Sequence, residues 1–166
     1  MENIKKQVIE LLTENARYTY SQMAKIVGAE EKIIEKAVKE LEKDGVIVKY
    51  SAIINEQAMS QDIVQALIEV KVALQKKAFD NYAEEISNFS EVKSLYLMSG
   101  GFDLAVFVEG KSIIDVARFV SEKLSKIEGV ESVQTQFVLK RFKIEGQKTR
   151  SNEEGERQII QAWEIF

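Results

Sequence analysis

The chain has 166 residues, a formal net charge of −4 and an apolar fraction of 45%, which fits one good-sized domain or two small ones with a buried core. It contains no cysteine and no histidine. Disulfides, thiolate metal sites and the usual general base are therefore excluded, and we expect neither an enzyme nor a cofactor. No apolar run approaches the roughly 20 residues of a membrane helix, and the N-terminus is charged. We therefore expect a cytoplasmic protein that does not contact membranes.

Residues 2–28 predict two short helices. Glu2 to Glu14 places apolar side chains on one face at helical spacing, while its charged side chains stay in water. Thr19 can cap a second helix, because its side-chain oxygen can accept from the unpaired amides of the first turn. That helix ends at Gly28, which suits the left-handed conformation of a tight turn between helices.

A third helix is predicted from Glu30 and is closed by Asp44 and Gly45. It turns four apolar side chains inward at positions i, i+3, i+4 and i+7: Ile34, Ala37, Val38 and Leu41. The run 46–54 is rich in β-branched residues and predicts a strand, or wing. Helices followed by a strand in this order are typical of a winged helix-turn-helix, which we assign to residues 1–55.

A second module follows residues 56–62, which we interpret as a linker. Four strands are predicted at 63–74, 92–98, 103–108 and 130–142, and two helices at 76–89 and 113–127. The first strand is expected to turn one set of apolar side chains inward: Ala66, Ile68, Val70 and Val72. The second of these helices is expected to bury another: Ile113, Val116, Ala117, Val120 and Leu124.

The order of these elements is βαββαβ. It predicts a ferredoxin-like domain over residues 63–143, with an antiparallel sheet covered by two helices on one face. Together with the winged helix-turn-helix of residues 1–55, called the head below, this domain makes the chain an α+β protein. Its sheet apolar residues are expected to form the core and a dimer surface.

Residues 144–166 form the predicted tail. Its first part is typical of a linker, and Glu153 to Trp163 predicts a helix whose acidic start suits the helix dipole. We expect Trp163 and Phe166 to dock onto the same or a neighbouring subunit, because exposed large apolar side chains are unfavourable. A disordered end is the alternative.

If the head binds DNA, its third helix is the recognition helix, because that element enters the major groove. The residues expected to contact phosphates are Arg17 before the second helix, Lys32, Lys36 and Lys39 on the third, and Lys49 on the wing.

The charge balance of this helix leaves a second interpretation open. Residues 30–44 hold six acids (Glu30, Glu31, Glu35, Glu40, Glu42, Asp44) and four lysines (Lys32, Lys36, Lys39, Lys43). DNA affinity depends on phosphate neutralisation, so a head of this composition predicts weak, salt-sensitive binding unless oligomerisation multiplies it. The alternative is a solvated helix face with pairs such as Glu35 with Lys39.

The second candidate site is the turn Ser99, Gly100, Gly101, Phe102, Asp103. Two adjacent glycines between apolar strands are also explained by a tight hairpin turn alone. An acid beside exposed turn amides could, however, hold an amino acid. The carboxylate would take the ammonium of the ligand, and the backbone amides would take its carboxyl group.

Several stretches, in their order and spacing, are similar to the Lrp/AsnC family of feast-and-famine transcription regulators: LLTENARYTYSQMAKIVG, KELEKDGVIVKYSAIIN, SGGFDL and EKLSKIEGVESVQTQFVLKRFK. The resemblance covers roughly Glu2 to Lys143. It implies a C-terminal RAM (ACT-like) module that builds homodimers by pairing sheets and often assembles further into octamers. It also implies an amino acid bound between subunits, near the turn that joins the second and third strands of the module.

The resemblance also supplies site residues. Ser99, Gly100, Gly101, Phe102 and Asp103 match the family's turn in full. Two further positions on the last strand, Thr135 and Gln136, match the family's polar positions and would form the opposing wall of the pocket, and Met98 would line it.

The sequence thus predicts a transcriptional regulator that binds double-stranded DNA and responds to a small-molecule effector, an amino acid. The alternative is an effector-sensing or scaffold oligomer with weakened or lost DNA binding, which the acidic third helix suggests. The identity of the effector does not follow from these residues.

Overall fold

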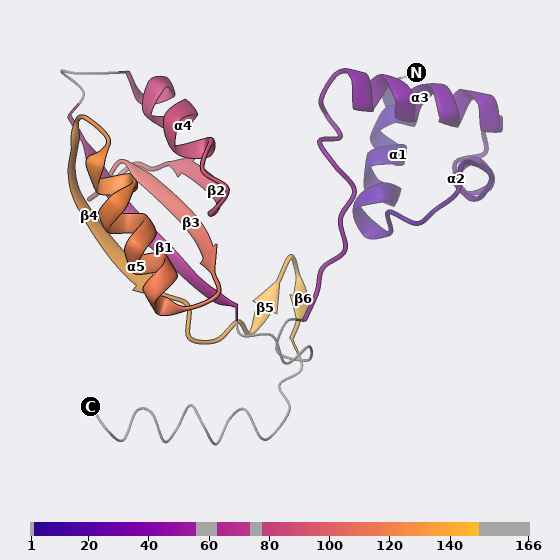
Figure 1. Ribbon diagram of the computed structural model, residues 1–166. Coiled ribbons are helices and arrows are strands. Elements are labelled where there is room, and N and C mark those ends of the chain that lie inside the picture. The colour runs from indigo at the N-terminus through magenta and orange to yellow at the C-terminus, as the bar shows by residue number, and fades with distance from the viewer. Residues whose placement is uncertain (1, 56–62, 74–77, 150–166) are drawn as a thin grey trace. The chain divides into compact units, whose positions relative to one another are not determined.

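The computed structural model describes residues 2–55, 63–73 and 78–149 (Figure 1). The chain divides into two compact units, Met1–Ile53 and Ile54–Phe166. The predicted linker at 56–62 and the predicted tail helix at 153–163 lie outside the described residues. Among the described helices, none has the length and apolar character needed to cross a membrane.

The first unit consists of three helices, α1 (Glu2–Glu14), α2 (Tyr20–Val27) and α3 (Glu31–Lys43). Thr19 caps α2 as predicted: its hydroxyl accepts from the Gln22 amide at 3.2 Å, and the Gln22 side chain accepts from the Thr19 amide at 2.9 Å. Gly28 ends α2 at a φ of 74°. Seven buried side chains form the core: Val8, Met23, Ala24, Ile34, Ala37, Val38 and Leu41.

The strand predicted at 46–54 is wrong. After Gly45, the amides of Val46 and Ile47 both donate to the Leu41 carbonyl, and residues 48–55 have no regular structure. A strand needs a neighbour for its backbone hydrogen bonds, and none pairs with this segment among the described residues. Four of its β-branched side chains, Val46, Val48, Ile53 and Ile54, are exposed, Val48 to 87%, whereas Ile47 is half-buried against the helical core.

The second unit is a four-stranded antiparallel sheet with two helices. The strands are β1 (Val64–Val72), β2 (Val92–Leu97), β3 (Leu104–Gly110) and β4 (Val130–Phe137), in the order β2-β3-β1-β4. The helices are α4 (Phe79–Ser87) and α5 (Ile113–Glu122), with a 3-10 turn, η2 (Leu124–Lys126), after α5. This is the ferredoxin-like order that the sequence predicts.

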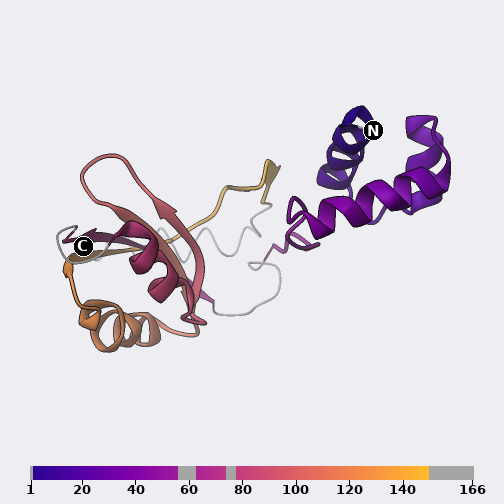
Figure 2. The same cartoon turned by 90° about the horizontal axis from the view of Figure 1, so that it is seen from above.

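Both helices pack on one face of this sheet (Figure 2). That face carries Ala66, Ile68, Val70 and Val72 of β1, all buried as predicted. The core also includes Tyr82, whose hydroxyl donates to the Ala73 carbonyl at 3.1 Å. Gly129 packs directly against this ring, because a Cβ added to it would lie 1.9 Å from the Tyr82 hydroxyl oxygen.

Two predicted elements are too long. The helix predicted at 113–127 ends at Glu122. Val116 and Leu124 are buried and Val120 packs against the core as predicted, but Ile113 (59%) and Ala117 are exposed, and Phe119 is buried in their place. The strand predicted at 130–142 ends at Phe137, the last residue of β4 in register with β1, and after it the Val138 amide donates to the Gln65 carbonyl. Residues placed in the tail form a hairpin instead, β5 (Lys143–Ile144) with β6 (Gln147–Lys148).

Candidate DNA-binding and effector sites

The outer face of α3 carries a line of four lysines. Lys32, Lys36, Lys39 and Lys43 follow one another at i, i+4, i+7 and i+11, which puts their side chains on one side of the helix. They line a shallow groove together with Glu35 and Glu40. The structure therefore brings together three of the predicted DNA-contacting residues. It adds Lys43, which helical spacing alone would have found.

Two of these lysines are paired with acids of the same helix. Lys39 Nζ lies 2.7 Å from Glu35 Oε1, and Lys36 Nζ lies 3.9 Å from Glu40 Oε1. Both lysine side chains are about two-thirds exposed, so water screens these pairs and DNA phosphates can compete for the lysines. Lys32 and Lys43 form no ion pair with any residue in the described part of the chain.

Lys5 of α1 forms a closer ion pair with Glu40 than Lys36 of the lysine line does. Its Nζ lies 2.8 Å from Glu40 Oε2 and 3.8 Å from Asp44 Oδ2. The hydrogen bond from Lys5 lowers the pKa of Glu40 from its ordinary value, which keeps this acid ionised and engaged. Lys5 thus neutralises part of the acidic charge that the sequence places on α3.

The remaining predicted DNA contacts lie off this helix. Arg17 is exposed in the loop before α2, where its backbone amide donates to Asn15 Oδ1 at 3.0 Å. Lys49 is exposed in the irregular segment after α3 and not on a wing strand. The structure does not bring Arg17 or Lys49 into the lysine line.

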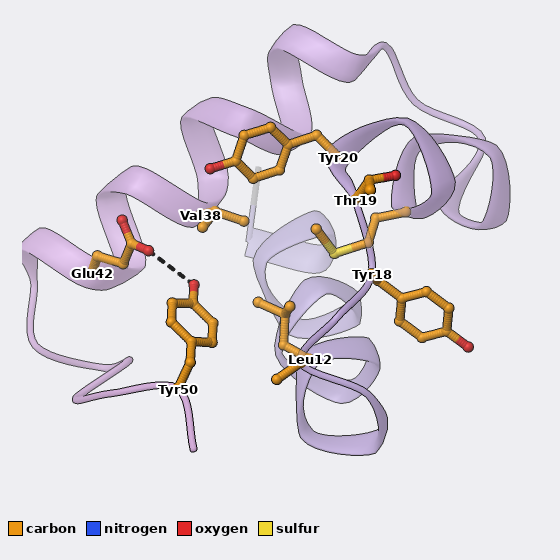
Figure 3. A pocket seen from close by; sticks show the side chains of 9 residues that line it. Leu12, Tyr18, Thr19, Tyr20, Val38, Glu42 and Tyr50 are labelled. Carbon is orange, nitrogen blue, oxygen red and sulfur yellow. Dashed lines mark hydrogen bonds between the residues drawn. The ribbon is translucent and has the colours of Figure 1, made fainter. Parts of the chain in front are cut away.

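A groove of about 390 Å³ opens on another side of the head (Figure 3). Its walls come from the end of α1, the start of α2, α3 and Tyr50. The Tyr50 hydroxyl donates to Glu42 Oε1 at 2.9 Å. Two effects raise the pKa of Tyr50 to about 12: burial has the larger effect, and the hydrogen bond to Glu42 has the smaller one. No local sequence pattern indicates this groove, because its lining residues come from separate segments of the chain.

In the second unit, hydrogen bonds at Met98 and Asp103 fix the two ends of the turn between β2 and β3. The Met98 amide donates to the Asp103 carbonyl at 2.8 Å, and the Asp103 amide donates to the Val70 carbonyl at 3.0 Å. Asp103 Oδ2 accepts from the Val72 amide at 2.9 Å, beside the β1 bulge at Lys71 and Val72. One oxygen of this carboxylate is therefore used by the fold, and no hydrogen bond from the described residues reaches the other, Oδ1.

The glycines of this turn border open space. A Cβ added at Gly100 or Gly101 would meet nothing within 4 Å, and Gly100 has a φ of 150° that favours glycine. Ser99 and Met98 beside them are exposed. The turn thus combines accessible backbone amides with a partly buried acid, a combination able to hold a zwitterion.

Thr135 and Gln136 lie elsewhere on the sheet. In the register of β4 with β1, Thr135 is opposite Ile68 and Gln136 is opposite Leu67, while the turn lies beside Val70 and Val72 across β1. Gln136 Nε2 donates to Glu69 Oε1 at 2.7 Å, on the face that α4 and α5 leave open. Within one chain, the structure does not bring the turn and these two residues together.

Both units match known families. A family model described as the Lrp/AsnC ligand binding domain matches residues 65–147, and one described as winged helix-turn-helix DNA-binding matches residues 1–48. The chain is 39% identical over 156 residues to YugG, an uncharacterized HTH-type transcriptional regulator of Bacillus subtilis. That match covers 93% of this chain and 94% of YugG.

Solved structures share the fold. The leucine response regulatory protein LrpA of Mycobacterium tuberculosis is similar with a TM-score of 0.76 at 21% identity, over 90% of this chain and 100% of that one. A feast or famine regulatory protein of the same organism, complexed with L-methionine, has a TM-score of 0.73 at 21% identity, over 89% and 98% of the two chains. With both family models matched and one relative 39% identical along nearly the whole chain, this protein belongs to the Lrp/AsnC family of DNA-binding transcription regulators, which are not enzymes.

Proposed function

We propose that this regulator changes its affinity for operator DNA when an amino acid binds at the turn Ser99 to Asp103 in a homo-oligomer. The observation that carries the proposal is the turn itself, where open space at two glycines adjoins a carboxylate with one oxygen uncommitted. A similar protein of known structure was solved with L-methionine, a ligand of the same chemical class.

The lysine line of α3 supports the DNA half of the proposal. Lys32 and Lys43 at its two ends, with Lys36 and Lys39 between them, would contact phosphates while α3 enters the major groove. Arg17 and Lys49 would add phosphate contacts at the edges of this surface. The acids among the lysines predict weak binding by a single head and a need for more than one head per complex, and the phosphate contacts make that binding salt-sensitive.

Separation of the site residues supports an effector bound between subunits. Because Thr135 and Gln136 lie across β1 from the turn, they can line its pocket only when a second chain supplies them. The sheet face opposite the helices carries Leu67, Tyr96 and Phe107, the last two in an edge-to-face contact at 5.9 Å. Pairing of two such faces would bury these side chains and form the dimer, from which octamers would assemble.

The effector site can be tested by isothermal titration calorimetry of the full chain with L-methionine and the other amino acids. At least one amino acid should bind, and Gly101→Val, which fills the open space, should weaken that binding by about tenfold or more. Ser90→Ala, in the loop before β2, is the matched control and should bind as the wild type does. An affinity that Gly101→Val leaves unchanged would remove the turn from the site.

The acidic composition of α3 supports a second candidate function, an effector-sensing oligomer that has lost DNA binding. Such a protein would bind its amino acid and assemble in light scattering, yet show no salt-sensitive association with DNA. The two functions differ only in the head, so the same preparation decides between them.

A further inference from the structure

The groove in the head is built differently from the rest of its surface. Leu12, Met23 and Val38 form an apolar floor, and Tyr20 and Tyr50 stand at its side. Figure 3 shows the Tyr20 hydroxyl and the Tyr50 ring near the Glu42 carboxylate, whereas the Tyr18 ring points away. Its volume of about 390 Å³ falls within the range of small-molecule pockets.

Glu42 is the charged group that lines this groove, and no lysine or arginine among the described residues forms an ion pair with it within 4 Å, although Lys39 of the same helix interacts with it electrostatically. Glu35, Glu40 and Asp44, on or next to the same helix, all have a lysine within 4 Å. The hydrogen bond that Glu42 accepts from a described side chain comes from a neutral donor, the Tyr50 hydroxyl, whereas the Lys39 ammonium is hydrogen-bonded to Glu35. No lysine or arginine lines the groove, so its electrostatic potential favours a positive ligand.

We propose that this groove binds a primary alkylammonium group. The Glu42 carboxylate is its counter-ion, the faces of Tyr20 and Tyr50 attract the cation, and the apolar floor takes the methylene groups. Such a group occurs both in free alkyl amines and in lysine side chains. Bound there, it would link α3 to the segment that leads out of the head through Tyr50.

The test compares n-pentylamine with pentan-1-ol, which has a similar chain but no charge. Each is titrated into the full-length protein, with the Met23 methyl and tyrosine ring signals followed by NMR. The amine should shift these signals with an affinity about tenfold higher than that of the alcohol, because charge-assisted and cation–π contacts are made only by the amine. Equal affinities, or no shift with the amine, would overturn the proposal.

Variants locate the effect. Glu42→Gln should lower the affinity for the amine to that for the alcohol, whereas Glu35→Gln, the matched control on the same helix, should leave it unchanged. Tyr50→Phe keeps the ring but frees Glu42 from its hydrogen bond, so amine binding should be retained or strengthened. Unchanged binding in Glu42→Gln would contradict the assignment of the counter-ion.

A third titration distinguishes the two sources of the alkylammonium group, a free amine and a lysine side chain of another protein. Nα-acetyl-lysine N-methylamide, a mimic of a lysine within a protein, is compared with cadaverine. Tighter binding of the lysine mimic indicates a protein partner, and tighter binding of the diamine indicates a free amine. Both results support the proposed chemistry, and binding of neither would exclude it.

Discussion

The two candidate sites of this regulator are held in opposite ways. On α3, the site residues are long, exposed side chains, and their partners Glu35 and Glu40 come from the same helix within four residues. At the turn between β2 and β3, Asp103 is tied to the backbone of β1, thirty-one residues earlier in the chain. The candidate DNA-binding surface is thus a local feature, whereas the candidate effector turn depends on its bonds to β1.

This contrast predicts different consequences of substitution. Charges on α3 can change without affecting the fold, because water and neighbouring side chains satisfy them. Loss of the Asp103 acceptor is expected to lower stability, because its carboxylate accepts from the Val72 amide, whereas loss of its charge alone tests effector binding. The predictions that follow test this contrast, beginning with the largest effect.

Reversing two charges of the lysine line should have the largest effect. Lys36→Glu with Lys39→Glu replaces two phosphate contacts with two repulsions, and DNA affinity should fall by about 100-fold or more at low salt. Fluorescence anisotropy measures the affinity, and light scattering should show unchanged assembly. Lys6→Glu with Lys126→Glu, an equal charge change off this surface, is the control. Equal losses in both double variants would mean that net charge, and not α3, governs binding.

Gly129→Ala should destabilise the sheet unit. The new Cβ would lie 1.9 Å from the Tyr82 hydroxyl oxygen, and the residue has a φ of 92°. The clash with Tyr82 and the backbone strain at positive φ together predict a loss of about 3 kcal/mol in the free energy of unfolding. Hydrogen exchange of the β1 amides would report it. Gly101→Ala, which meets open space, should change stability by less than about 0.5 kcal/mol. A tolerated Gly129→Ala would show that the Tyr82 contact is loose.

Two substitutions of Asp103 separate its roles. Asp103→Asn keeps an oxygen for the Val72 amide but removes the charge, so effector affinity should fall about tenfold with little change in stability. Asp103→Ala also removes the acceptor and should destabilise the unit by about 1–2 kcal/mol. Calorimetry and denaturant unfolding measure the two quantities. Full effector affinity in Asp103→Asn would limit this residue to a structural role.

The smallest effect concerns Lys5. In Lys5→Met, Glu40 loses its partner at 2.8 Å and is free to pair more closely with Lys36. DNA affinity should then fall about two- to threefold, the size expected of an exposed ion pair. Lys6→Met is the control for loss of one positive charge on α1. If both variants bind DNA equally, Lys5 has no special influence on the lysine line.

Local patterns predicted most of the helices. The Thr19 cap, the left-handed Gly28 and the inward face of α3 depend on residues within one or two turns, and the structure has all of them. The same periodicity placed Lys32, Lys36 and Lys39 on one surface. Each of these features is determined by residues that are close in the sequence, and it can therefore be predicted from the sequence.

Predictions that depended on distant partners were less accurate. The strand expected at 46–54 lacks a neighbour among the described residues, and β4 ends where β1 stops offering one. The groove in the head escaped notice because Leu12, Tyr20, Glu42 and Tyr50 come from four separate segments. The tie from Asp103 to Val72 likewise joins residues that no local pattern connects.

We expect this protein both to bind DNA and to change that binding when an amino acid binds. The most direct test is fluorescence anisotropy with a labelled fragment from upstream of its own gene, at low and moderate salt, with and without each amino acid. The expected result is saturable binding that weakens with salt and shifts with at least one amino acid. Absence of binding at low salt, in a preparation that an amino acid still stabilises against heat, would contradict it.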